Sequence, residues 1–378
     1  MNRNDVFVVA DNILSPIGKT TPENFSQLKQ GVSAVKKHHD LNISAQPFYA
    51  SLFAKGERFI NNDQHGYTKF EQLLIASVAD ALKQSVIEAA DRKTVFILSS
   101  TKGNIGLLET ENFDAVLKAR IALSTSARLV SDHFGFVNQP VIVSNACISG
   151  VLAIITGMRL LRSGHYENAI IAGADVMSKF IFSGFESFNA LSPQMCKPFD
   201  QLRDGLNLGE CGGTIILSTN RKYEQHIKVK GGSVSNDANH ISGPSRTGKE
   251  LGYAVNKAIE DAALSTGDID FISAHGTATV YNDEMEANAL NLSGLQAVPV
   301  NSLKGYYGHT LGAAGLIESI ISIQSLKENL VLPALGFKDP GVTKPLNICT
   351  ELLTGDFKNC LKTASGFGGC NVAAVFGK

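Results

Sequence analysis

Short apolar runs recur along the chain and predict buried strands, because several are rich in β-branched residues and polar turns bound them. Longer stretches with the apolar spacing of helices separate these runs. The strand-like runs cover residues 6–10, 95–99, 141–143, 169–172, 214–217, 227–229, 271–273, 298–300 and 372–376. The helix-like stretches cover residues 71–88, 149–161, 248–263 and 313–328. Strands that alternate with helices predict an α/β fold with layered helices and sheets.

The chain divides most simply into two similarly built α/β halves that meet near Tyr223. No linker of low complexity separates them, and neither half repeats the sequence of the other in an obvious way. We therefore expect an N-terminal half over residues 1–222 and a C-terminal half over residues 223–378, related as a structural pseudo-repeat. A chain of 378 residues is long enough for two such units or for one large domain.

The composition is that of a globular, well-buried protein, since 44% of the residues are hydrophobic and 18% are charged. With 34 basic and 35 acidic residues, the overall charge gives no indication of nucleic-acid binding. A local basic patch that binds an acidic partner is compatible with this charge. The apolar run at residues 6–10 is too short for a signal peptide, and no run is long enough to span a bilayer.

The patterns of cysteines, histidines and glycines limit which cellular compartment and which cofactors the protein can be expected to have. The six cysteines form no CxxC pair and show no disulfide-like spacing, so we expect free thiols in a cytoplasmic protein. The nine histidines form no HExxH motif, and no catalytic zinc or other metal site is expected. The glycine-rich turns contain neither a dinucleotide-binding motif nor a P-loop, so no nucleotide-phosphate site is expected.

Cys147 is the first candidate for chemistry. It lies in the segment PVIVSNACISG, where a buried strand, a short polar turn and the start of a helix follow one another. A thiol in the first turn of a helix lies near free backbone N–H groups and the positive end of the helix dipole, which favour the thiolate. The alternative for a lone cysteine is a buried structural residue.

Two further segments favour a catalytic role for Cys147. SAHGTATVYNDEMEAN contains His275, and NSLKGYYGHTLGAAG contains Lys304 and His309. Together with SNACISG around Cys147, they resemble the three signatures of elongating β-ketoacyl-acyl-carrier-protein synthases, the Cys-His-His ketosynthases of the thiolase superfamily. PFDQLRDGLNLGECGG and SGFGGCN resemble two further motifs of that family, and the motifs occur in the family's order.

The resemblance implies a thiolase-like fold of two pseudo-repeated α/β halves, layered as α-β-α-β-α, with the active site between them. It also implies a homodimer, or a heterodimer with a related ketosynthase-like chain. The implied reaction is a decarboxylative Claisen condensation of an acyl group with malonyl-acyl-carrier protein, which gives a 3-oxoacyl-acyl-carrier protein. An acyl-carrier protein is the implied partner, and no cofactor is implied beyond its phosphopantetheine arm.

This chemistry gives a role to each motif. Cys147 would hold the acyl group as an acyl-enzyme. His275 and His309 would donate hydrogen bonds from Nε2 to the enolate that decarboxylation creates, whereas either one alone would be read as a core histidine. The resemblance makes Lys304 a buried charge that tunes the site, although most lysines lie at the surface. It places an oxyanion hole at the backbone N–H groups of Cys147 and Phe367, and it makes Phe367 a gate to the acyl pocket instead of a plain core aromatic.

Two acids and a lysine accompany these motifs. Glu286 and Glu318 match acids that lie near the catalytic histidines in the family, and Glu318 is placed to keep Lys304 charged. In related enzymes these acids, an Asn and a Ser can surround a cation, but here Ser273 replaces the Asn and Lys362 replaces the Ser. We therefore hypothesise that the Lys362 ammonium replaces the cation by pairing with Glu286 or Glu318. The alternative is a solvated lysine.

Several positions depart from the family pattern and leave the acyl substrate open. Ser365 replaces the first phenylalanine of the glycine-rich motif, Cys370 replaces a threonine that follows it, and Asn282 replaces a glycine. Residues 36–66 match the family poorly. These changes affect the acyl pocket and the docking surface, and they favour a specialised polyketide or aryl-polyene pathway over housekeeping fatty-acid synthesis.

Two other functions remain open at this point. A non-catalytic chain-length-factor-like partner subunit would share the fold, but such subunits usually lack the nucleophile that Cys147 provides. A degradative thiolase would need a second active-site cysteine, for which Cys370 is the candidate, and it has no role for His309. Because carrier proteins are acidic, we expect a basic surface near the entrance, with the candidates Lys55, Arg58, Lys102 and Arg128.

Overall fold

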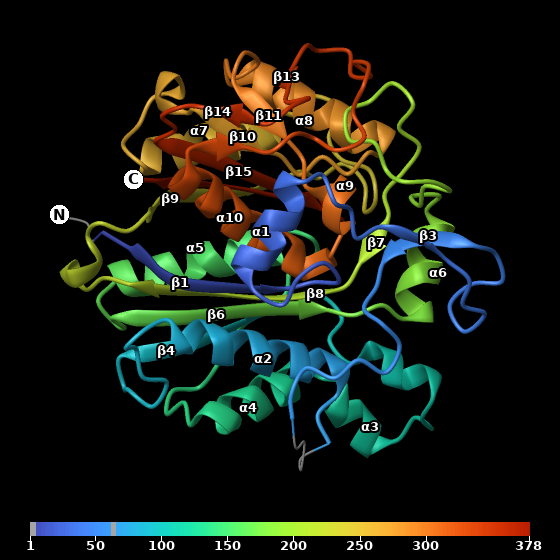
Figure 1. Ribbon diagram of the computed structural model, residues 1–378, viewed down its shortest axis with the longest axis vertical. Helices are drawn as coiled ribbons and strands as arrows, with labels where there is room; N and C mark the ends of the chain where they lie inside the picture. Colours follow the sequence, from blue (N-terminus) through green and yellow to red (C-terminus); the bar gives the residue numbers. More distant parts are fainter. Residues whose placement is uncertain (1–4, 62–65) are drawn as a thin grey trace.

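The computed structural model describes residues 5–61 and 66–378 of the chain, and Figure 1 shows how they are layered. Within these residues, eleven strands form one mixed sheet that runs through the molecule. The strand order is β13 (Asn347–Ile348), β11 (Pro299–Asn301), β10 (Phe271–Ser273), β15 (Asn359–Gly366), β16 (Cys370–Gly377), β9 (Lys228–Asn236), β1 (Phe7–Leu14), β8 (Cys211–Ser218), β6 (Asn168–Asp175), β4 (Thr94–Ser99) and β5 (Val141–Val143).

The two halves of this sheet have the same topology. Their strands lie in the orders β1-β8-β6-β4-β5 and β9-β16-β15-β10-β11. In each half the first three strands of that order pair antiparallel, and the last three pair parallel. The halves join where β1 and β9 pair antiparallel, for example through a hydrogen bond from Val8 N to Ile227 O (2.7 Å). The pseudo-repeat predicted from the strand pattern is therefore present.

Helices cover both outer faces and fill the space between the two half-sheets, which confirms the predicted α-β-α-β-α layers (Figure 1). On the outside, α2 (Lys69–Lys83) packs against β1, β6 and β8, and α7 (Lys249–Asp261) packs against β9, β15 and β16. In the middle, α5 (Ser149–Arg162) and α10 (Leu311–Glu328) pack against each other and against strands of both halves.

The helices α5 and α10 cross at close range, and glycine makes this possible. A Cβ atom on Gly150 would lie 2.4 Å from Leu316 N, and one on Gly315 would lie 2.5 Å from Val151 Cγ2. Nearly every residue of α10 is buried, as expected for a helix with other elements on all sides. The close crossing fixes the starts of both helices, which lie next to the candidate nucleophile and one candidate histidine.

The remaining elements surround this core. The helices are α1 (Thr21–Lys29), α3 (Ala115–Arg120), α4 (Leu123–Phe134), α6 (Lys179–Ser187), α8 (Val280–Leu292) and α9 (Lys304–Tyr307), with short 3-10 helices at η1 (Ile105–Glu109), η2 (Arg221–Tyr223) and η3 (Thr266–Asp268). The short strands are β2 (Lys36–His38), β3 (Phe48–Ser51), β7 (Leu208–Gly209), β12 (Leu330–Val331) and β14 (Leu353–Thr354). None of the described helices has the length and apolar character needed to cross a membrane.

The predicted strands and helices are present, most with boundaries that differ by a few residues, although β9 continues seven residues beyond the predicted run 227–229. The helix predicted over 71–88 ends earlier, at Lys83, where Gln84 caps it. The sequence did not predict the helices α1, α4, α6 and α8, and among the strands of the large sheet it missed β15, whose residues NCLKTASG lack a β-branched run. This strand is buried between β10 and β16 although it carries a lysine.

Candidate active site

Four candidate residues from distant segments line one cavity of about 550 Å³. Cys147 lies between β5 and α5, and His309 lies between α9 and α10 in the equivalent connection of the second half. His275 follows β10, and Phe367 lies in the turn between β15 and β16. The parallel strands β10 and β11 end at the same edge of the sheet, which brings the two histidine segments together.

Cys147 is held in a strained turn just before α5. Ala146 adopts a φ of +43°, which L-residues rarely take. The Ser149 hydroxyl supports the turn, because it accepts a hydrogen bond from Asn145 N (2.7 Å) and donates one to Ala146 O (2.7 Å). Cys147 is 8% exposed, through the cavity that it lines. The strained residue therefore lies directly beside the candidate nucleophile.

The Cys147 thiol is protonated at neutral pH, which corrects the expectation of a favoured thiolate. Burial raises its pKa to about 12, and the neighbouring Cys370 acts in the same direction. Lys304 and a backbone hydrogen bond from Phe367 lower the pKa but do not outweigh burial. Helix α5 begins only at Ser149, so Cys147 lies before the first helical turn. A base in the cavity must therefore accept the proton when the sulfur attacks a substrate.

This protonation state predicts slow alkylation of Cys147 at neutral pH. Iodoacetamide reacts with the thiolate, and a pKa of about 12 keeps the thiolate fraction small. Between pH 7 and pH 9, the alkylation rate should rise roughly tenfold for each pH unit. Intact-mass spectrometry of timed samples, with peptide mapping of the modified residue, measures this rate. A plateau in the rate near pH 7 would contradict the prediction, because it would mean that the thiolate is already formed there.

His275 and His309 lie side by side, with ring centroids 5.3 Å apart and ring planes at 84°. Hydrogen bonds hold their backbones, from His275 N to Glu286 Oε1 (2.8 Å) and from His309 N to Asn207 O (2.6 Å). Both Nδ1 atoms are buried and have no hydrogen-bond partner among the described residues. Buried unpaired N–H groups are rarer in proteins than buried unpaired acceptors. We therefore place the proton of each neutral ring on Nε2.

Both histidines are neutral at physiological pH. Burial is the largest cause that holds the pKa of each imidazole well below its ordinary value, and the Lys304 ammonium acts in the same direction on both rings. A neutral imidazole can accept the proton of a thiol or donate a hydrogen bond from its N–H. The pair can therefore supply the base that Cys147 needs and the donors that an anionic oxygen needs.

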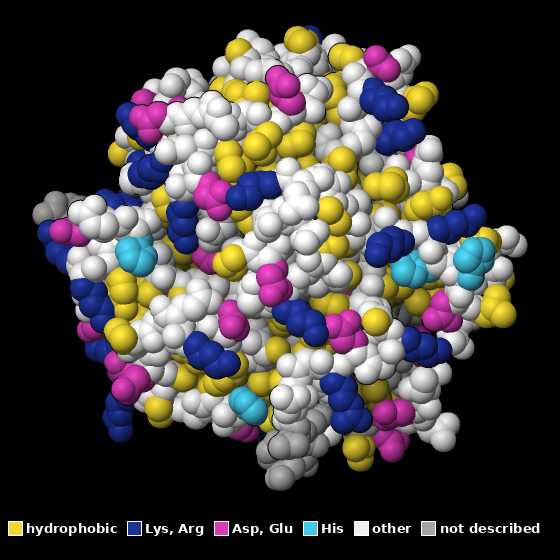
Figure 2. Space-filling view, viewed as in Figure 1, with side chains coloured by type: hydrophobic (Ala, Val, Ile, Leu, Met, Phe, Trp, Pro, Cys, Tyr) yellow, Lys and Arg dark blue, Asp and Glu magenta, His cyan; other side chains and the backbone are white. Residues whose placement is uncertain are grey.

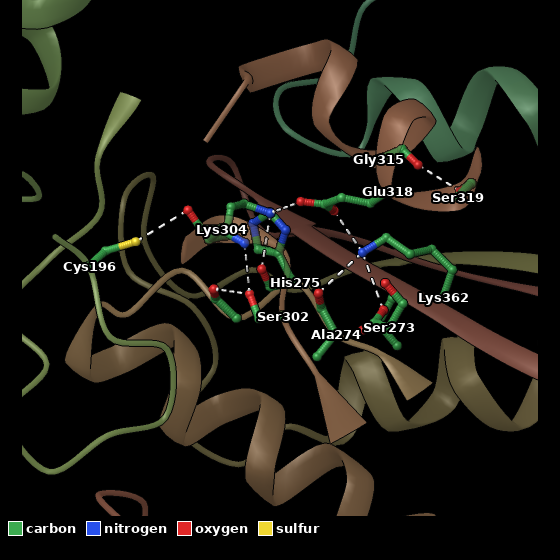
Figure 3. Close-up of polar contacts among 12 residues, drawn as sticks. Cys196, Ser273, Ala274, His275, Ser302, Lys304, Gly315, Glu318, Ser319 and Lys362 are labelled. Carbon is green, nitrogen blue, oxygen red and sulfur yellow. Dashed lines mark hydrogen bonds and ion pairs between the residues drawn. The ribbon is translucent and has the colours of Figure 1, made fainter. Parts of the chain in front are cut away.

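Lys304 is fully buried next to His275, so the alternative of a surface lysine does not apply (Figure 3). Its Nζ donates to His275 O (3.0 Å) and forms an ion pair with Glu318. The other carboxylate oxygen of Glu318 pairs with Lys362 Nζ (2.7 Å). Burial acts to raise the pKa of Glu318, but the two ammonium groups outweigh it, so the pKa is lowered and Glu318 is ionised. The structure thus brings Lys304, Glu318 and Lys362 into one buried network.

Glu286 supports the histidine turn from the other side. Its carboxylate accepts hydrogen bonds from His275 N and Gly276 N, each 2.8 Å long. Of the two acids that were expected as partners of Lys362, Glu318 forms the ion pair, and Glu286 holds the backbone at His275. In the described part of the chain, no group of three or more His, Cys, Asp or Glu side chains is arranged to hold a metal ion.

Phe367 lies half-buried in the tight turn that joins β15 to β16. Gly368 and Gly369 complete this turn with φ of +86° and +78°, which favour glycine. The backbone N–H of Phe367 lies within hydrogen-bonding reach of the Cys147 thiol. It can therefore join the N–H of Cys147 in binding an oxygen that becomes negative during acyl transfer.

Two aromatic rings that the sequence analysis missed hold the Phe367 ring. Phe185 stacks on it with centroids 5.6 Å apart, and Phe188 meets it edge-on at 5.2 Å. Phe185 also contacts the His309 ring edge-on, with centroids 6.4 Å apart. The signal in the sequence was an aromatic pair three residues apart in SGFESFNALS, immediately before the loop that leads to PFDQLRDG. These rings link the proposed gate to one of the histidines.

The mouth of the cavity is apolar and acidic. Its exposed apolar side chains are Phe188, Ile241, Val280 and Tyr281. The exposed Asp204 lies there as well, the buried Asp237 also lines the cavity, and the lining contains no lysine or arginine among the described residues. The expected basic candidates are exposed but lie outside the lining; they are Lys55, Arg58, Lys102 and Arg128. On the face shown in Figure 2, basic and acidic side chains are interspersed. The basic surface expected near the entrance stays a prediction, because the four candidates do not form part of the cavity itself.

The sequence matches two family models that together cover most of the chain. Residues 3–222 match the beta-ketoacyl synthase N-terminal domain, and residues 226–338 match the beta-ketoacyl synthase C-terminal domain. The curated protein 3-oxoacyl-(acyl-carrier-protein) synthase 2 of Vibrio harveyi is 28% identical to this chain, and the alignment covers 100% of this chain and 99% of the relative.

Two solved structures have the same fold over their whole length. The ishigamide ketosynthase/chain length factor superposes with a TM-score of 0.90 at 24% identity, covering 100% of this chain and 99% of that one. The ketosynthase ApeO in complex with its chain length factor ApeC, from Xenorhabdus doucetiae, superposes with a TM-score of 0.86 at 24% identity, covering 99% of this chain and 98% of that one. At these identities the likeness shows a shared fold.

Proposed function

The chain belongs to the β-ketoacyl synthase family, and we propose that it condenses an acyl group held on Cys147 with a malonyl group carried by an acyl-carrier protein. The product is a 3-oxoacyl-acyl-carrier protein, formed in chain elongation of the fatty-acid or polyketide type. The observation that carries this proposal is the meeting of Cys147, His275 and His309 in one cavity.

Transfer of the acyl group to Cys147 is the first step. The sulfur attacks the carbonyl carbon of the acyl thioester while one imidazole, after shifting its ring proton from Nε2 to Nδ1, accepts the thiol proton at Nε2. The carbonyl oxygen becomes negative and accepts hydrogen bonds from the backbone N–H groups of Cys147 and Phe367. When the tetrahedral intermediate collapses, the bond from carbon to the pantetheine sulfur breaks, and that sulfur takes the proton from the imidazole.

Decarboxylation of the malonyl group supplies the carbanion for the second step. The bond between the carboxylate and C2 breaks, CO₂ leaves, and the electron pair forms an enolate. The Nε2 N–H groups of His275 and His309 stabilise the enolate oxygen in a site that excludes most water. C2 then attacks the acyl carbon on Cys147, the bond from that carbon to Sγ breaks as the intermediate collapses, and the Cys147 thiolate takes up a proton from the solvent. Lys304 lies outside the cavity lining and acts through Glu318 and the His275 carbonyl.

The carrier protein brings the only prosthetic group that this proposal needs, its phosphopantetheine arm. A cavity of about 550 Å³ with an apolar lining suits a slender arm and an acyl chain. All six cysteines are free thiols, which supports a reducing, cytoplasmic compartment. The size of the acyl group depends on the side chains around the cavity and on any partner that closes it.

We expect the protein to act as a dimer. Strand β5 lies at one end of the large sheet and, among the described strands, pairs with β4 alone. Ile142 in its centre is exposed. Proteins usually cover such an edge, because its free backbone groups pair readily with other strands. We propose that a second copy of this chain, or a related ketosynthase-like chain, covers it.

The two alternative functions fit the site less well. A thiolase needs a second cysteine at the reaction centre, but the Cys370 thiol packs against Phe367 O (3.5 Å) and Asn145 O (3.8 Å), outside the lining formed by the described residues. A non-catalytic partner subunit has no use for Cys147 in a strained turn beside two neutral histidines.

The test is to load the protein from acyl-carrier proteins with acyl groups of increasing length and then to add malonyl-carrier protein. Intact-mass spectrometry should show uptake of one acyl group, its loss after the second addition, and a 3-oxoacyl-carrier protein longer by two carbons. A folded protein that takes up no acyl group, alone or with candidate partner subunits, would support the non-catalytic partner instead.

A further inference from the structure

Lys362 is a fully buried lysine in the middle of β15. Its backbone lies in register with Ser273 of the parallel strand β10, and its side chain reaches the segment that leads to His275 (Figure 3). The ammonium nitrogen has three oxygen neighbours: Glu318 Oε2 at 2.7 Å, Ser273 O at 3.2 Å and Ala274 O at 3.2 Å. A buried ammonium is tolerated only with such partners, because its desolvation is costly.

The backbone from Ser273 to Gly276 is held by charges on both sides. On one side, Lys362 binds the carbonyls of residues 273 and 274, and Lys304 binds the carbonyl of His275. On the other side, the Glu286 carboxylate accepts the N–H groups of His275 and Gly276. Glu318 joins the two lysines, with one carboxylate oxygen on each. Every peptide unit around His275 is therefore tied to a charged group.

We propose that Lys362 is a positioning residue that serves as a tethered monovalent cation. Its ammonium fills an oxygen site formed by Ser273 O, Ala274 O and Glu318, and it thereby holds the turn that carries His275 without a dissociable ion. The catalytic consequence rests on the proposed condensation, whereas the ion-site chemistry does not.

The three oxygen neighbours explain why removal of the side chain should create a metal-ion site. Two carbonyl oxygens and a carboxylate oxygen are hard ligands that suit alkali-metal ions. Loss of the Lys362 ammonium would leave these oxygens facing a vacated volume with one positive charge fewer. A small side chain at position 362 would leave room for K⁺ or Na⁺, whereas a long apolar one would fill the same volume.

The test compares Lys362→Ala with Lys362→Met in KCl and in choline chloride at equal ionic strength. Choline is too large to enter the site. The unfolding midpoint of the wild type should be the same in both salts. Lys362→Ala should unfold at a lower temperature in choline chloride and regain part of the difference in KCl, with a saturable dependence on KCl concentration. Lys362→Met should be destabilised and should not respond to KCl. This readout does not depend on enzymatic activity.

Turnover gives the second readout. In choline chloride, Lys362→Ala should lose more than tenfold in kcat for 3-oxoacyl-carrier formation, and KCl should restore part of it; Lys362→Met should stay low in both salts. Lys358→Ala is the matched control, because Lys358 is exposed just before β15 and pairs only loosely with Asp356 (3.5 Å); it should behave as the wild type.

Three results would overturn the proposal. The first is a wild type whose unfolding midpoint or rate depends on K⁺. The second is a Lys362→Ala variant as stable and active as the wild type in choline chloride. The third is an equal response of the alanine and methionine variants to KCl, which would place the ion elsewhere. If neither substituted protein folds, the proposal is still tested by the wild type, whose unfolding midpoint must be the same in KCl and in choline chloride. A wild type that shows no turnover would contradict the proposed function and leave the stability test in force.

Discussion

Replacement of Cys147 by alanine is expected to abolish acyl-enzyme formation and to lower the rate of 3-oxoacyl-carrier formation by at least about a thousandfold. The variant lacks the sulfur that carries the acyl group between the two steps, and no other thiol lies in the cavity lining of the described residues. Because the cysteine is a small residue in a turn, its loss should change the unfolding temperature little. Intact-mass spectrometry of the enzyme and of the carrier proteins measures both effects.

The control for Cys147→Ala is Cys349→Ala, which removes a buried thiol that is not part of the cavity lining. This variant should load acyl groups as the wild type does. The Cys147 variant should keep the ability to decarboxylate malonyl-carrier protein, because His275 and His309 remain in place. Acylation of the Cys147 variant at a normal rate would show that another residue is the nucleophile.

The architecture could be predicted from the apolar runs because most central strands are buried on both faces. Such strands read as continuous apolar segments, and their alternation with helices gives the layers. The motifs then placed Cys147, His275 and His309 at the ends of strands or the starts of helices, where the structure has them. Strand β15 escaped prediction, because its buried positions include Lys362 and Thr363, which only partners from other strands and helices make tolerable.

The electrostatics of the site could not be read from the sequence. The expectation of a thiolate at Cys147 rested on its position near a helix start, and it failed because burial by segments from both halves has the larger effect. The choice of Glu318 instead of Glu286 as the partner of Lys362 depends on how α10 packs against β15. Such contacts join residues far apart in the chain, so spacing in the sequence carries no record of them.

The aromatic cluster and the cavity mouth were also beyond prediction. The sequence shows Phe185 and Phe188 only as an aromatic pair three residues apart, and it does not show that the turn with Phe367 packs against them. Ile241 lies in the loop between β9 and α7 and Tyr281 lies in α8, and only the fold brings their apolar side chains to one opening. A pocket surface of this kind is a property of the tertiary structure.

Replacement of either histidine by alanine is expected to slow decarboxylation of malonyl-carrier protein by about a hundredfold to a thousandfold, which corresponds to about 3 to 4 kcal/mol of lost stabilisation of the enolate. The active form of each ring is neutral, and burial keeps the pKa of both rings well below 6.5. The wild-type rate should therefore be flat from pH 6.5 to pH 8 and should fall only when the pH drops below the lowered pKa values and the rings become protonated.

The control variant is His309→Gln, which keeps an N–H donor and should retain more activity than His309→Ala. Release of CO₂, followed over this pH range for the wild type and the three variants, measures these effects. Equal losses in His309→Gln and His309→Ala, or a wild-type rate that falls already near pH 6.5, would mean that hydrogen bonds from neutral imidazoles do not stabilise the enolate.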